Sequence, residues 1–126
     1  MARFAAAYMA LLPALGLVLA IGAPAPAADL EFFTGESLSA QCAAKSGDVD
    51  FAAKQGRCVG YVVGVSDAQQ AGQGQGAAQK VCFPAGVTAT TMVGVVSGFL
   101  TAHPDKRPLA AQDLVVEALA AQYPCK

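Results

Sequence analysis

The sequence contains few of the residues from which catalytic sites are usually built. Its 126 residues include one histidine, His103, and only 13% of them are charged. A catalytic site needs a nucleophile or a metal ion with a positioned base, whereas His103 directly precedes a proline in a predicted turn. A dyad of His103 with Cys82 or Cys125 would need a free thiolate, which an even number of cysteines disfavours. We therefore expect that the protein is not an enzyme.

Closely spaced metal ligands and an excess of positive charge are also missing. The nearest two of the four cysteines are sixteen residues apart, whereas zinc sites take ligand pairs at close spacing. Lys and Arg together number eight against nine Asp and Glu, which gives a formal net charge of −1. Nucleic-acid-binding proteins usually carry a basic patch, and none is visible. We expect no metal, no cofactor and no nucleic-acid partner.

The N-terminal part has the pattern of an export signal. Residues 4–21 form an uncharged, apolar run that ends in an alternation of alanine and proline. Ala25 and Ala27 fit a small-x-small cleavage site. A membrane anchor is the alternative, because the run could span a bilayer of about 30 Å. We predict a cleaved signal peptide over 1–27 and an exported domain over 28–126 that has no membrane contact after cleavage.

The four cysteines all lie in the exported part, at Cys42, Cys58, Cys82 and Cys125. In a secreted chain of this size an even number predicts two disulfides, because a small core needs covalent support. Sequence alone allows three connectivities. A hairpin of the first two helices would favour Cys42 with Cys58. Antiparallel packing of the last two helices would favour Cys82 with Cys125.

The first two helices are predicted from capping residues and from a short connection. Thr34 can cap a helix that runs to about Lys45. Asp48 or Asp50 offers the next cap, and the helical pattern resumes at Phe51. A connection this short predicts that the two helices are antiparallel neighbours.

The second helix contains the stretch around which the domain is organised. Its apolar stripe consists of Cys58, Tyr61, Val62 and Val65. A strand is the competing interpretation, because residues 59–65 are rich in β-branched side chains. Gly60 and Gly64 are four residues apart, and Gly94 and Gly98 repeat that spacing in a later helix. This repeat favours helices, and it predicts that the two helices cross closely at these glycines.

Two more helices complete the expected fold. Thr88 caps a helix through Leu100, residues 102–108 end it, and Pro108 suits the first turn of the last helix. The apolar face of that last helix is predicted to consist of Ala111, Leu114, Val115, Ala118, Leu119 and Gln122. The fold class is therefore all-α, a small bundle of four to five helices tied by two disulfides.

Residues 69–80 interrupt the helical pattern, with glycines alternating with glutamines. They predict a surface loop, either a slack connector or a binding segment. The candidate interface residues are Gln73, Gln75, Gln79 and Lys80. Asp67, near the end of the second helix, is either a buried acid or a hydrogen-bonding residue at the helix end.

Five short motifs follow one another along the exported part of the chain. They are Gly35-x-x-Leu38-x-x-x-Cys42, Cys58-x-x-Tyr61-x-x-Gly64-x-x-Asp67-Ala68, Cys82-x-Pro84, Leu100-x-x-His103-Pro104 and Ala118-Leu119-x-x-x-Tyr123-Pro124-Cys125. In order and spacing they resemble the Rap/Tai immunity proteins. The resemblance covers nearly the whole exported domain.

The resemblance implies a small periplasmic all-helical domain that is often dimeric. It implies that the protein binds a peptidoglycan amidase delivered by a type VI secretion system and covers the amidase's catalytic groove with a protruding segment. Residues 69–80 and the turn 102–108 are the candidate segments here. The alternatives are a periplasmic acid-stress chaperone and a protein-binding helical domain without a toxin partner.

Overall fold

The computed structural model describes residues 33–72 and 80–126. Over these residues it contains four α-helices, one 3₁₀ helix and no strands, so the predicted all-α class is confirmed. The helices are α1 (Gly35–Cys42), α2 (Phe51–Ala71), α3 (Ala89–Ala102), η2 (Pro104–Lys106) and α4 (Ala111–Gln122). The predicted signal peptide, residues 1–27, lies outside the described residues.

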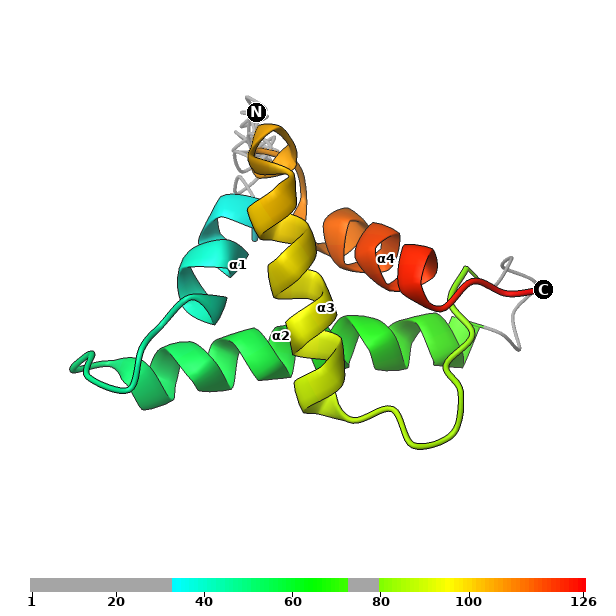
Figure 1. The fold of residues 1–126 in the computed structure, drawn as a ribbon, viewed down its shortest axis with the longest axis horizontal. Helices are drawn as coiled ribbons and strands as arrows, with labels where there is room; N and C mark the ends of the chain where they lie inside the picture. Colours follow the sequence, from blue (N-terminus) through cyan, green and yellow to red (C-terminus); the bar gives the residue numbers. More distant parts are fainter. Residues whose placement is uncertain (1–32, 73–79) are drawn as a thin grey trace, which may run out of the picture.

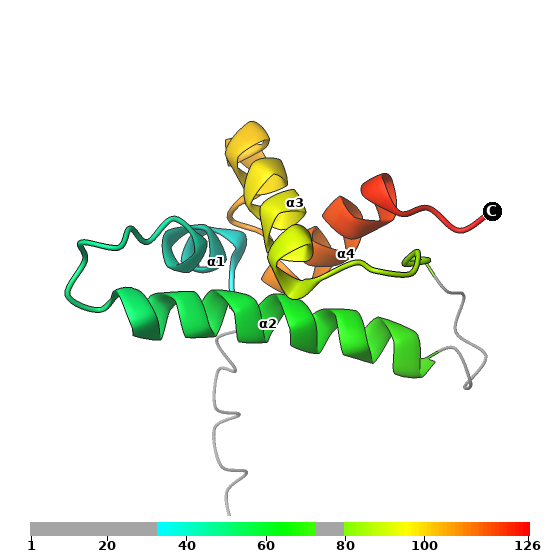
Figure 2. The same cartoon turned by 60° about the horizontal axis from the view of Figure 1, so that its bottom comes forward.

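The long helix α2 is the base of the fold. It has 21 residues, and α1, α3 and α4 all lie on one side of it (Figure 1, Figure 2). Neither predicted antiparallel pair is present, because α1 runs across α2 and because α3 and α4 diverge at a wide angle in both views. The three shorter helices converge on α2 instead of lying along it.

The core is the place where these helices converge. Its fully buried apolar residues are Leu38 of α1, Cys58 and Val62 of α2, Val96 and Leu100 of α3, and Ala111, Leu114, Val115, Ala118 and Leu119 of α4, with Val81 from the segment before α3. The stripe predicted on α2 therefore faces the core as expected, with Tyr61 and Val65 packed at its edge. On α4 the predicted face is also correct, except that Gln122 is exposed.

One buried polar residue of α2, Ser66, was not anticipated. Its side chain is 2% exposed, and its hydroxyl donates a hydrogen bond of 2.8 Å to the carbonyl of Val62. This bond satisfies the hydroxyl inside the helix, which is why the polar side chain is tolerated in the core.

The N-terminus of α1 is held by a segment from the other end of the chain. Thr34 accepts a hydrogen bond from the backbone N–H of Ser37, which confirms the predicted cap. The N–H groups of Gly35 and Glu36 donate to the carbonyls of Leu109 and Arg107, at 2.9 and 2.8 Å. The first N–H groups of a helix have no partner inside it, so this pairing satisfies groups that would otherwise be left open.

Close approach of these two segments requires glycine at position 35. A Cβ atom built on Gly35 would overlap the Leu114 side chain and would lie 2.9 Å from the carbonyl oxygen of Arg107. The same construction at Gly60, Gly64, Gly94 and Gly98 meets no atom of residues 33–72 and 80–126 within 4 Å. The predicted close crossing at the glycines of α2 and α3 is therefore wrong, because those glycines lie on faces that point away from the core.

Several helix ends also differ from the predictions. The first helix ends at Cys42 instead of near Lys45. Asp50 occupies the cap position of α2 but makes no capping hydrogen bond. The last helix begins at Ala111 and not at Pro108, because the backbone of residues 107–109 is already committed to pairing with the start of α1.

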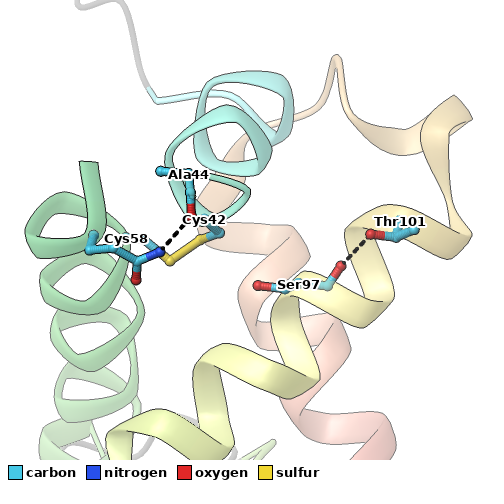
Figure 3. Close-up of a disulfide and its surroundings, with 6 residues drawn as sticks. Cys42, Ala44, Cys58, Ser97 and Thr101 are labelled. Atoms are coloured by element: carbon cyan, nitrogen blue, oxygen red, sulfur yellow. Dashed lines mark hydrogen bonds between the residues drawn. A yellow bond between two sulfur atoms is a disulfide. The ribbon is translucent and has the colours of Figure 1, made fainter. Parts of the chain in front are cut away.

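The first disulfide joins α1 to α2. Cys42 and Cys58 have Cα atoms 5.1 Å apart, and Figure 3 shows the bridge between the two helices, beside Ala44. Across a small hollow lie Ser97 and Thr101 of α3, where the Thr101 hydroxyl donates to the Ser97 carbonyl at 2.8 Å. The predicted pairing is confirmed, although the helices that it joins cross instead of forming an antiparallel hairpin.

The second disulfide, Cys82–Cys125, is also confirmed, with Cα atoms 4.9 Å apart. Its position does not depend on antiparallel helices. Val81 pairs with Pro124 in an isolated antiparallel bridge, and the N–H of Cys82 donates to the Tyr123 carbonyl at 2.9 Å. Two short extended segments, one before α3 and one after α4, thus bring the cysteines together.

The surroundings of Gly35 and Gly94 predict opposite effects of an alanine substitution at these two positions. Gly35→Ala should lower the free energy of unfolding by about 1–3 kcal/mol, because its methyl group overlaps neighbouring atoms. Gly94→Ala should raise it by up to about 1 kcal/mol, because alanine is the better helix former and space is open there. Urea denaturation of the two variants measures both changes, and stabilisation by Gly35→Ala would contradict the packing described here.

The two disulfides should differ in their contribution to stability. In the chain-entropy model the stabilisation grows with the length of the closed loop, and the sequence separations are 43 and 16 residues. The double variant Cys82→Ala/Cys125→Ala should therefore lose about 1 kcal/mol more than Cys42→Ala/Cys58→Ala. Denaturant titration tests this order, which is refuted if the shorter loop proves the more stabilising.

Candidate functional site

The residues considered for catalysis have structural roles. All four cysteines are in disulfides, so none supplies a thiolate for a dyad with His103. The His103 ring stacks on Phe99 with centroids 4.3 Å apart, and its Nδ1 lies 2.9 Å from the Phe99 carbonyl oxygen. Residues 33–72 and 80–126 also include no group of three or more His, Cys, Asp or Glu that could hold a metal ion.

The remaining motif residues are dispersed over the fold. Leu38 is fully buried and Tyr61 is half-buried, whereas Gly64, Asp67, Pro84, Pro104 and Pro124 are exposed. Asp67 is therefore not a buried acid. These residues do not converge on one site, so a functional surface has to be sought from the shape of the molecule.

The first candidate surface is a groove between α2 and α4. A hollow of about 340 Å³ is lined by Gly60, Tyr61, Gly64, Val65 and Ala68 of α2 and by Gln112 of α4. Further hollows adjoin it and share Tyr61 or Gln112 with it. The two exposed glycines make the α2 side of the groove flat and expose its backbone. We call this surface the α2–α4 groove.

Tyr61 is the central side chain of the α2–α4 groove. Its ring packs on Phe33 with centroids 5.0 Å apart. Burial raises the pKa of the Tyr61 phenol, and the charge of Asp113 acts in the same direction, against a hydrogen bond to the Gln112 backbone. The phenol is therefore protonated at neutral pH, and it presents an aromatic face and a hydroxyl without charge.

The far end of the α2–α4 groove is charged. There a hollow of about 510 Å³ is lined by Gln69, Lys80, Gln112, Asp113 and Glu117, among others. Lys80 is the one predicted interface residue that the structure describes, and it lies here. The other three, Gln73, Gln75 and Gln79, lie outside the described residues.

The second candidate surface is the turn 102–108, which is tightly held by its own side chains. Arg107 donates from Nε to the Leu100 carbonyl at 2.8 Å. Lys106 forms an ion pair with Glu117 and lies over the Phe99 ring, 5.5 Å from its centroid. Both cationic side chains are thus engaged by residues of the neighbouring helices α3 and α4. After the turn, Leu109 has a side chain that is 55% exposed.

The third candidate surface, residues 43–50, was missed by the sequence analysis. We call it the α1–α2 loop. It projects beyond the helices in both views (Figure 1, Figure 2), and Val49 in it is fully exposed, at 107%. A signal was present in the sequence, since a valine between Asp48 and Asp50 is an apolar side chain in an otherwise polar connection.

No helix in the described parts of the chain is both long and apolar enough to cross a membrane. The structure thus offers three exposed features on a disulfide-tied scaffold: the α2–α4 groove, the turn 102–108 and the α1–α2 loop.

Comparison with known proteins identifies the family. The family model described as Rap1a immunity proteins matches residues 34–125. No curated protein and no solved structure matched the chain. The match extends from the cap of α1 to the second cysteine of the last disulfide, and so includes every described helix. The chain therefore belongs to the Rap1a immunity protein family.

Proposed function

We propose that the protein is a periplasmic immunity protein that binds a peptidoglycan amidase effector of a type VI secretion system and blocks it sterically. The observation that carries this proposal is the family match over residues 34–125. Membership of this family implies that the partner is an effector protein. Immunity proteins act by binding, which agrees with a chain whose histidine and cysteines are committed to structure.

The disulfides support a periplasmic location. All four cysteines are paired, and disulfides persist in oxidising compartments such as the bacterial periplasm. An amidase that cleaves peptidoglycan works in the same compartment. An inhibitor would have to be exported there, which is the role that we propose for the apolar residues 4–21 and the cleavage site that follows them.

Steric blocking requires a scaffold that keeps its shape. Rigid binding surfaces lose less conformational entropy on association, so more of the contact energy appears as affinity. Here one disulfide connects α1 to α2, and the other connects the segment before α3 to the C-terminal segment. We propose that the blocking segment is one of the connections between the helices. Residues 69–80 and the turn 102–108 are the candidates suggested by the family resemblance, and the α1–α2 loop is a third candidate that the structure adds.

The acid-stress chaperone has less support. Such a protein must loosen when its carboxylates are protonated, and Ser66 is the only buried polar side chain among the described residues. The pKa of Asp50 is lowered by its hydrogen bond to Lys54. That contact stabilises the fold above the ordinary pKa of aspartate and is lost as the pH falls, but Asp50 is exposed, so its contribution is small.

We further propose that the protein is a homodimer and that the α2–α4 groove receives the second copy. Gly60 and Gly64 each cost helix stability of about 1 kcal/mol against alanine. No atom of the described residues comes within 4 Å of a Cβ atom built at either position, so the described part of the fold gives no compensating contact. A helix from a second copy would approach α2 closely at the flat surface that the two glycines form beside Tyr61.

The amidase proposal predicts tight inhibition. The oxidised protein, purified from the periplasm, should bind the peptidoglycan amidase encoded nearest its gene with nanomolar affinity, about 12 kcal/mol of association. Calorimetry measures the binding, and release of cleaved peptidoglycan fragments measures the inhibition. Binding without loss of cleavage would contradict steric blocking, and absence of binding would refute the proposed partner.

The homodimer proposal predicts a specific sensitivity at the groove. Light scattering of the purified protein should give the mass of two chains, and Gly64→Leu should return it to one chain because the larger side chain fills the flat surface. Gly94→Leu, at an equally open glycine on α3, is the matched control and should leave the dimer intact. A monomeric wild-type protein would refute the proposal.

A further inference from the structure

The α1–α2 loop projects from the body of the fold (Figure 1, Figure 2). Its eight residues connect α1 to α2 at the end of the molecule opposite the C-terminus (Figure 1). After α1 the loop extends past the start of α2 (Figure 1, Figure 2). The chain then turns back into α2, which begins at Phe51. A connection that only had to link the two helices would not need to project in this way.

The base of the loop is fixed to the helices. Cys42, directly before the loop, is bonded to Cys58 of α2. The Gln55 side chain of α2 donates from Nε2 to the Ala44 carbonyl at 3.3 Å. Asp50, the last residue of the loop, forms an ion pair of 3.0 Å with Lys54. Both arms of the loop are thus attached to the same helix.

The apex of the loop is held by its own backbone. The N–H of Lys45 donates to the Asp48 carboxylate at 3.0 Å, and the N–H of Asp48 donates to the Lys45 carbonyl at 2.9 Å. The Asp48 carbonyl accepts from the N–H of Phe51 at 3.1 Å. The first two bonds close a turn over residues 45–48, and the third closes a turn over residues 48–51 that contains Val49, so the backbone on which Val49 lies is held by the loop itself.

Val49 is the large apolar side chain of this loop, and the fold itself does not use it. Both flanking carboxylates have partners, whereas the valine is fully exposed, at 107%. Leu109, the other exposed large apolar side chain among the described residues, is only 55% exposed. A β-branched side chain has few rotamers, so burying it in a partner costs little conformational entropy.

From these observations we propose that the α1–α2 loop is the segment that enters the effector's cleft, with Val49 as the anchor. This inference rests on the proposed function, since it names the blocking segment of that same inhibitor. The matching site is a narrow pocket with apolar walls for the valine. Its rim carries hydrogen-bond donors or positive charge, because Asp48 and Asp50 flank the anchor.

The test compares binding of the oxidised wild-type protein and its variants to the peptidoglycan amidase encoded nearest the gene. Val49→Asp should raise the dissociation constant about 30-fold or more, as expected for a central anchor. Val49→Ser, which adds no charge, should raise it about tenfold. Both variants should keep the thermal stability of the wild type, because Val49 packs against nothing in the fold.

Leu109→Asp makes the same change at the other exposed apolar side chain, which lies beside the turn 102–108, and it therefore distinguishes the α1–α2 loop from that turn as the blocking segment. It should change the dissociation constant by less than about threefold. If wild type binds the amidase and Val49→Asp binds equally well, the role of the loop is refuted while the proposed function stands. A loss confined to Val49→Asp, without one in Val49→Ser, would also refute the anchor and indicate charge repulsion. If wild type fails to bind, both proposals fall.

Discussion

The small size of the core is the constraint on which the rest of the structure depends. In the part of the chain that the structure describes, eleven apolar residues are buried, and they lie where α1, α3 and α4 converge on the middle of α2. A core of this size buries too little apolar surface to hold four helices firmly. The remaining support comes from two disulfides and two short backbone pairings, at Thr34 with Ala110 and at Val81 with Pro124.

These supports also explain which features of the fold could be predicted from the sequence and which could not. Helix positions follow from local rules, so Thr34 and Thr88 were correctly assigned as caps. The crossing of the helices does not follow from such rules. It depends on which backbone groups pair across the chain, and the pairing of residues 107–109 with the start of α1 moved the beginning of α4 to Ala111.

The glycines show the same limit. A four-residue spacing tells which face of a helix the glycines share, but not what lies opposite that face. Gly60 and Gly64 therefore suggested a crossing that is absent, whereas Gly35, which has no such partner in the sequence, is the glycine that the packing requires. Val49 was not predicted as an exposed feature for a related reason, because helical periodicity gives no information about side chains in loops.

In the proposed function, support and recognition belong to different parts of the molecule. The disulfides and the buried face of α2 hold the fold, while the α2–α4 groove and the α1–α2 loop lie on its surface at different places. For a Rap1a immunity protein this division allows the surface residues to follow changes in an effector. Substitutions at Val49 or Lys80 alter no contact of the core.

The pairing at the start of α1 also has a consequence for the order in which the protein can fold. The N–H groups of Gly35 and Glu36 and the carbonyl of Phe33 find their backbone partners in residues 107–111, which are synthesised near the end of the chain. A partly emerged polypeptide lacks these partners and the whole of α4, which supplies much of the core. The native state therefore closes in a late step that needs almost the complete chain. This delay agrees with the export that we propose, in which the polypeptide would have to remain unfolded while it crosses a membrane.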